Sequence, residues 1–181
     1  MTGALTLALA VGLCLSAVAG EARAETTAGA PAGPSAEMKK LAFLVGSITG
    51  TGKMYMPNQD AMDWTSSDTS TWTPGGQYLK SESKVSYKGF GTDDSLTMMA
   101  YDQQAKVYRM WRYSSMATLP IEASGNFEGN KLVLITKPTD TGQVFRATFE
   151  PKAKGEVSFL LEMKQGDKYE KLQEGLFVGK P

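Results

Sequence analysis

The side chains of this sequence best suited to binding chemistry lie together in residues 107–114. Two guanidinium groups, those of Arg109 and Arg112, alternate there with aromatic rings that include Trp111 and Tyr113. Aromatic walls around one buried guanidinium suit an amphipathic carboxylate, because arginine binds a carboxylate through two parallel hydrogen bonds. The structural alternative is that one arginine extends into solvent while the other forms an ion pair within the protein. The residue types alone leave both interpretations open.

An earlier segment supplies the expected partners of these arginines. Trp64, Asp68 and Trp72 share one phase of a predicted strand, and Asp68 is the nearest candidate to neutralise Arg109. The predicted ligand-binding set is therefore Asp68, Trp72, Arg109, Trp111 and Tyr113. It assumes that the face with Arg109, Trp111 and Tyr113 points inward, because a barrel rich in aromatic residues buries Trp111 more readily than it displays it. The opposite choice would turn Arg112 inward.

The composition excludes several classes of site. A Ser-His-Asp triad, the usual zinc sites and a haem with a proximal histidine all need histidine, and the sequence contains none. No cofactor is predicted. The thioethers of Met54 and Met56 are possible metal ligands, but both residues share the phase of the core residues of their strand, so no metal site is predicted there either. Asp93 and Asp94 lack the spaced carboxylates of a calcium loop, and we expect them to be solvated turn residues. The 19 basic and 19 acidic residues leave no net charge, which argues against nucleic acid as a partner.

A repeated plan of strand, turn and strand positions these residues. Residues 96–116 contain two apolar–aromatic runs around the polar break 102–105, which predicts a β-hairpin. About ten such short strands with tight turns follow one another as far as Val178. This pattern predicts a mainly β fold, an antiparallel up-and-down barrel of the lipocalin-like type. One short amphipathic helix, Ser35–Val45, precedes the barrel and is capped by Ser35.

The first 34 residues are predicted to lie outside this fold. The apolar run Ala4–Ala19 ends in two small-x-small sites typical of a secretory signal peptide, although no Lys or Arg precedes it. We assign residues 1–24 to the signal, residues 25–34 to a flexible linker and residues 35–181 to the barrel. We therefore expect an exported protein, periplasmic or extracellular, with no membrane span. The only cysteine, Cys14, lies in the signal, so the mature chain would hold no disulfide.

Two motifs resemble those of a known bacterial family. Residues 41–52, LAFLVGSITGTG, resemble its opening Leu-x-x-Leu-x-Gly-x-Trp-x-Gly-x-Gly, and residues 100–102 with Tyr108 and Trp111 resemble its Gly-Tyr-Asp…Tyr…Trp hairpin. The family is a domain of unknown function that consists of exported, lipocalin-like (calycin-type) β-barrels, distantly similar to nitrobindin-type haem barrels. Ile48 stands where the family pattern has tryptophan. The resemblance implies a fold and no assigned activity, and without histidine no haem is expected.

These observations favour non-catalytic binding of a small apolar or amphipathic molecule inside the barrel, with a carboxylate as the expected polar group. One alternative is a histidine-free enzyme, such as an isomerase, that uses tyrosine, arginine or a carboxylate on such a ligand. Another is a cell-envelope interaction module whose barrel is filled. A cavity would separate the first two functions from the third, and a buried acid with a shifted pKa would favour the enzyme. The oligomeric state and the ligand do not follow from the sequence.

Overall fold

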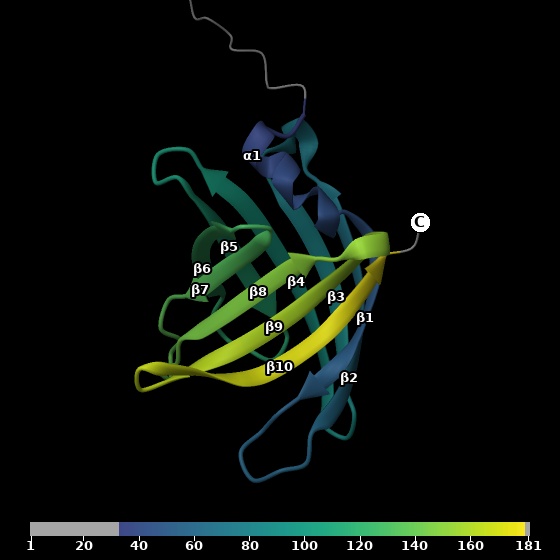
Figure 1. Ribbon diagram of the computed structural model, residues 1–181, viewed down its shortest axis with the longest axis vertical. Helices are drawn as coiled ribbons and strands as arrows, with labels where there is room; N and C mark the ends of the chain where they lie inside the picture. The colour runs from purple at the N-terminus through teal and green to yellow at the C-terminus, as the bar shows by residue number, and fades with distance from the viewer. Residues whose placement is uncertain (1–32, 180–181) are drawn as a thin grey trace, which may run out of the picture.

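A computed structural model describes residues 33–179 of the chain. The predicted signal peptide and most of the predicted linker lie outside the described residues. Ten antiparallel strands form one closed barrel in which each strand pairs with its neighbours in the chain, and the last strand pairs with the first. The predicted up-and-down β-barrel with one helical segment before it is confirmed (Figure 1).

The strands are β1 (Gly46–Met54), β2 (Met62–Trp72), β3 (Leu79–Tyr87), β4 (Gly91–Asp102), β5 (Val107–Ser114), β6 (Ile121–Glu128), β7 (Lys131–Thr136), β8 (Phe145–Pro151), β9 (Glu156–Gln165) and β10 (Lys168–Gly179). Two short 3₁₀ helices, η2 (Pro74–Gly76) and η3 (Ala153–Gly155), lie in the β2–β3 and β8–β9 connections. The barrel closes where β1 pairs with β10, from Ile48 opposite Gly179 to Met54 opposite Gln173. Within the described residues, none of the helices has the length and apolar character of a membrane span.

The segment before the barrel lies across one of its ends (Figure 1). It consists of α1 (Ala36–Lys39) and the 3₁₀ helix η1 (Lys40–Leu44), so the single helix predicted for Ser35–Val45 is one α-helical turn that continues as a 3₁₀ helix. Ser35 caps it as predicted, since its Oγ accepts a hydrogen bond from the Met38 amide at 3.2 Å. Three residues per turn align Leu41 with Leu44. Both are buried in the core cluster at this end of the barrel.

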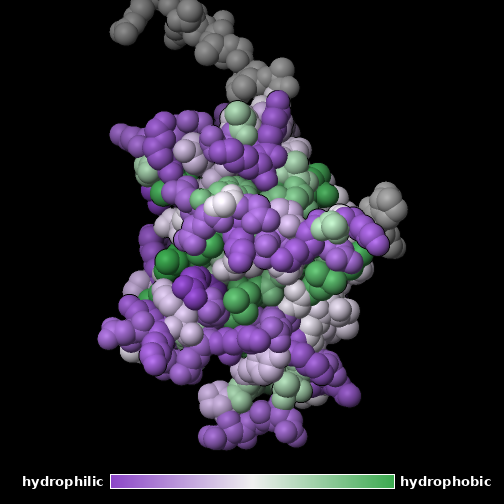
Figure 2. Space-filling model, viewed as in Figure 1, coloured by the Kyte–Doolittle hydropathy of each residue, from purple (hydrophilic) through white to green (hydrophobic). Residues whose placement is uncertain are grey.

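The strands alternate inward and outward residues as the sequence predicts for most of the chain. On β9, Val157 is buried, and Phe159 and Leu161 face the barrel interior. On β3, Leu79 and Val85 are buried, whereas Lys84 is exposed. In the view of Figure 2 the outer surface is mostly hydrophilic, and smaller apolar patches interrupt it. The interior of the barrel therefore holds the main apolar core.

The glycines of β1 bring this strand close to the interior side chains, as their spacing predicts. A Cβ atom on Gly52 would lie 2.0 Å from the Glu174 carbonyl oxygen and 2.7 Å from Cε2 of Trp64. The Trp64 indole lies against this glycine, and its Nε1 donates to the same carbonyl at 3.2 Å. Trp64 is consequently fixed on the inner wall, 2% exposed.

Candidate functional site

A cavity of about 340 Å³ occupies the barrel. Its lining includes Leu44 of η1, which places one end of the cavity beneath the helical segment. The lining also includes Met54, Thr136 and Phe145, which stand at strand ends far from that segment. The cavity therefore runs along the barrel from the helical end towards the opposite end.

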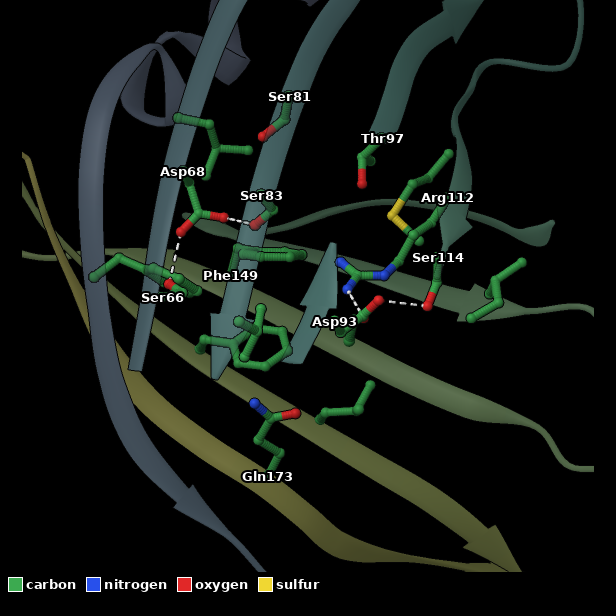
Figure 3. Close-up of a pocket in the computed structure, with 18 of the residues that line it drawn as sticks. Ser66, Asp68, Ser81, Ser83, Asp93, Thr97, Arg112, Ser114, Phe149 and Gln173 are labelled. Atoms are coloured by element: carbon green, nitrogen blue, oxygen red, sulfur yellow. Dashed lines mark hydrogen bonds and ion pairs between the residues drawn. The ribbon is translucent and has the colours of Figure 1, made fainter. Parts of the chain in front are cut away.

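One wall of the cavity is polar, and four consecutive strands build it. Strand register places inward residues of β2, β3, β4 and β5 side by side in two rows. One row contains Ser70, Ser81, Thr97 and Arg112, and the next contains Asp68, Ser83, Ser95 and Ser114. Ser66 and Asp93 continue the wall on β2 and β4 (Figure 3). A hydrogen-bonding surface thus covers one side of the interior.

The other wall is apolar and aromatic, and β8, β9 and β10 supply most of it. The rings of Phe149 and Phe159 lie 5.1 Å apart, and those of Phe159 and Phe177 lie 5.8 Å apart. Trp64 joins this group from β2, with its ring 5.8 Å from that of Phe177. Edge-to-face and tilted contacts at these separations are the favourable ones for aromatic pairs. The cavity therefore has one apolar side and one polar side.

A guanidinium and a carboxylate are paired on the polar wall. Arg112 Nη2 on β5 donates to Asp93 Oδ2 on β4 at 2.7 Å, and Ser114 Oγ donates to Asp93 Oδ1 at 2.6 Å (Figure 3). The expectation that Asp93 is a solvated turn residue is wrong, because β4 begins at Gly91 and turns Asp93 inward, where it is 6% exposed. The positive charge of Arg112 is thus neutralised within the wall.

Asp68 on β2 is the other carboxylate of the cavity. Its Oδ2 accepts a hydrogen bond from Ser66 Oγ at 2.6 Å, and its Oδ1 accepts one from Ser83 Oγ. It forms no ion pair among residues 33–179. Burial raises the pKa of this carboxyl above its usual value, although the hydrogen bond from Ser66 and the charge of Arg112 act in the opposite direction. Burial likewise raises the pKa of Tyr87, which also lines the cavity.

Three residues of the predicted binding set lie outside the cavity. The prediction that Arg109, Trp111 and Tyr113 point inward is wrong, because the inner face of β5 carries Tyr108, Met110 and Arg112.

Contacts of Tyr108 in the core fix this orientation of β5. The Tyr108 hydroxyl donates to the Glu37 carbonyl at 2.9 Å, and its ring packs on Tyr101 and Phe127. Arg109 Nε donates instead to Asp102 Oδ2 at 2.8 Å on the outer face of the hairpin. Asp68 and Arg109 are therefore not partners.

The two remaining predicted residues point into the barrel. Asp68 lines the cavity, and its role in ligand binding stays a prediction. Trp72 packs on the core cluster beneath the helical segment, beyond the cavity lining. The serines of the polar wall were not among the residues predicted from the sequence. Their signal was the spacing Ser66-x-Asp68-x-Ser70 in phase with Trp64, and Ser81-x-Ser83 in phase with Leu79.

No metal centre is evident in the described part of the chain. Nowhere in it do three His, Cys, Asp or Glu side chains gather as a ligand set. The two cavity carboxylates belong to separate hydrogen-bonded groups, one centred on Asp68 and one on Asp93 (Figure 3). The arrangement is suited to hydrogen bonding and charge pairing with a small organic molecule rather than to metal coordination.

Comparisons with known proteins agree with the fold. The model of a family described as "Protein of unknown function (DUF1579)" matches residues 33–173. The barrel is similar to Rv2717c from M. tuberculosis, with a TM-score of 0.63 and 12% identity, over 82% of this chain and 99% of that one. It is also similar to the S-type phycobiliprotein lyase CPES from Guillardia theta, with a TM-score of 0.55 and 13% identity over the same shares. At such identities these likenesses show the fold alone. No curated protein matches the sequence.

Proposed function

This chain belongs to the DUF1579 family of lipocalin-like barrels, and we propose that it binds a small amphipathic molecule in its barrel. The observation that carries the proposal is the two-sided cavity of about 340 Å³. Cavities of roughly 300–1,000 Å³ are the usual size for small-molecule sites. The apolar part of the ligand lies against Phe149, Phe159 and Phe177, and its polar part faces the serine-rich wall of β2–β5. An interaction module with a filled barrel would have no need of this space.

The charges of the cavity indicate which polar group it accepts. In the lining formed by the described residues, the carboxyl groups are those of Asp68 and Asp93 and the guanidinium is that of Arg112, so carboxyl groups outnumber cationic groups by one. Arg112 already donates to Asp93. A ligand carboxylate would therefore compete with Asp93 for the guanidinium and add a negative charge next to two others. The cavity favours a neutral or cationic polar group over the carboxylate expected from the sequence.

Native mass spectrometry of protein purified from its own host tests the proposal. We expect a bound molecule of a few hundred daltons, on the order of what such a cavity holds, which is released when the protein unfolds. A second measurement uses Trp64 as a reporter, because it lines the cavity. In a Trp72→Phe, Trp111→Phe background the fluorescence of Trp64 should change when an apolar dye is added.

Matched variants decide whether the dye enters the barrel. Ala147→Phe adds a ring on the inner face of β8, where Ala147 is buried and lines the cavity, and should abolish the response. Ser124→Phe adds the same ring on the exposed outer face of β6 and should leave it unchanged. Melting curves confirm that both variants fold. Absence of any co-purified molecule together with equal dye responses in the two variants would refute the proposal.

A second candidate function is proton transfer on the bound molecule. One observation favours it: burial raises the pKa of Asp68 above the usual value of a carboxyl group, and shifts in this direction are common among carboxyl groups that act as acids or bases. The test incubates the co-purified molecule with the protein in D₂O and follows deuterium incorporation by mass spectrometry. Incorporation that Asp68→Asn abolishes supports an enzyme, whereas binding without exchange supports the carrier.

The site of action is also a proposal. We infer that the chain is exported and that the barrel acts in the periplasm or outside the cell. The support is the apolar run Ala4–Ala19 and the small-x-small sites that follow it.

A further inference from the structure

We propose that the ligand's polar group is a protonated amine and that Asp68 binds it through an ion pair. This inference rests on the proposed function, because it names the class of molecule that the same cavity receives. It depends on three features of the interior: the charge of Asp68, which has no counter-ion in the described part of the chain, the hydroxyl oxygens beside it, and the aromatic wall of the same cavity.

The first feature is the distribution of charge. Arg112 forms its ion pair with Asp93, at 2.7 Å, and acts on Asp68 only as a more distant charge. Asp68 has only hydroxyl partners among the described residues, Ser66 and Ser83, and its charge has no counter-ion there. Buried charges in proteins are usually paired, because an isolated charge is costly to desolvate. A cation supplied by the ligand would complete the pairing.

The second feature is the capacity of the site to accept further hydrogen bonds. A carboxylate has about four lone-pair sites, and the serines use two of those on Asp68. An ammonium group has three N–H donors. In the adjoining row, Ser70 Oγ donates to Ser81 Oγ at 2.9 Å, which leaves the Ser81 oxygen free to accept another hydrogen bond. Two free sites on Asp68 and one on the Ser81 oxygen make three acceptor sites, which equals the number of donors on a primary ammonium group.

The third feature is the aromatic wall. Phe149, Phe159 and Phe177 present rings to the same cavity. Ring faces attract a cation and also pack on an alkyl or aryl body. Arg112 acts against the binding of a cation, but Asp93 neutralises it. The interior therefore favours a molecule with one ammonium end and one apolar end.

The experiment compares three molecules that share one apolar chain: decylamine, decanol and decanoate. Each is titrated into the full chain at about pH 8, where the amine is protonated and the acid is ionised, and Trp64 fluorescence or calorimetry reports binding. We expect decylamine to bind at least about tenfold more tightly than decanol, with decanoate the weakest of the three. Asp68→Asn should remove the advantage of the amine, so that decylamine and decanol then bind with about equal affinity. Asp94→Asn, an exposed carboxylate on the outer face of β4, is the control and should change nothing.

The outcomes separate this inference from the proposed function. Equal affinities for decylamine and decanol in the unaltered chain would overturn the amine inference while leaving an amphipathic binding site in place. Tighter binding of decanoate would also overturn it. No binding of any of the three, together with no co-purified molecule, would refute the proposed function itself. The comparison of the three molecules in the unaltered chain decides the question even where Asp68→Asn fails to fold.

Discussion

Arg112→Met tests the orientation of β5 and the ion pair inside the barrel. Arg112 and Asp93 face each other across β5 and β4, and their side chains are 27% and 8% exposed. The substitution keeps an unbranched apolar side chain but leaves the buried Asp93 carboxylate without its counter-ion. The folded state should therefore lose stability.

The magnitude follows from what remains around Asp93. Removing one member of a buried ion pair costs about 3–5 kcal/mol. Asp93 keeps hydrogen bonds from the hydroxyls of Ser114 and Ser115, and Arg112 is partly exposed, so we expect the lower end, about 3 kcal/mol. For a domain of this size that loss lowers Tm by about 6–12 °C. Asp93→Asn combined with Arg112→Met removes both charges and should recover about half of the loss.

Arg109→Met is the matched control on the same strand. Arg109 pairs with Asp102 on the outer face, where the two side chains are 40% and 26% exposed. Partly exposed pairs of this kind contribute less than about 1 kcal/mol. Urea titrations and circular-dichroism melts of the single and double variants give the comparison. A larger loss for Arg109→Met than for Arg112→Met would show that the assignment of faces is reversed.

Three further predictions concern packing, pH and processing. Phe159→Ala, on the aromatic wall, should lower the free energy of unfolding measured in urea titrations by about 3 kcal/mol, whereas Lys164→Ala on the same strand should lower it by less than about 0.5 kcal/mol. Equal losses would contradict the assignment of inward and outward residues on β9. Burial raises the pKa of Asp68, so its carboxyl group holds a proton more tightly in the folded state than in the unfolded state. The stability that this proton binding contributes is fully present below the pKa of the unfolded state, about 4, and is lost as the pH rises through the pKa of the folded state. Asp68→Asn should therefore raise Tm at neutral pH and leave it nearly unchanged at about pH 3; the reverse pattern would contradict the burial of this carboxyl. N-terminal sequencing of the chain from its host should give Glu25 or Gly20 as the first residue, and retention of Met1 would refute export.

The fold could be predicted from the sequence because its signals are local. Each strand has a period of two, and each turn is marked by nearby Gly, Pro, Asn or Asp. The meander requires only that neighbours in the chain pair, which the short connections favour. Even the close approach at β1 was indicated by the glycines between Ile48 and Met54. Closure of β10 onto β1 follows once ten such strands curl into a lipocalin-like barrel.

The polar wall was harder to predict because it depends on contacts between distant residues. Both faces of β5 carry an arginine and aromatic residues, so its pattern has no unique inner side. The choice is made by Tyr108, whose hydroxyl reaches the Glu37 carbonyl 71 residues away in the chain. Asp93 was missed for a related reason. The glycines before it indicated a loop, whereas pairing with β3 extends β4 back to Gly91.

The polar wall is itself an argument for function, because stability alone gives no reason for it. The helical end of the barrel is filled with apolar side chains, including Leu41 and Leu79, each at most 2% exposed. The same packing along β2–β5 would avoid the desolvation of two carboxylates, a guanidinium and a row of hydroxyls, and apolar replacements of buried ion pairs are often stabilising. The apolar pattern is interrupted on four adjacent strands, and one carboxylate there has no counter-ion among residues 33–179. These exceptions to the usual packing of a barrel interior all lie at one site. Such a departure is expected where a molecule binds, and it supports the proposal that the barrel binds a molecule in its interior.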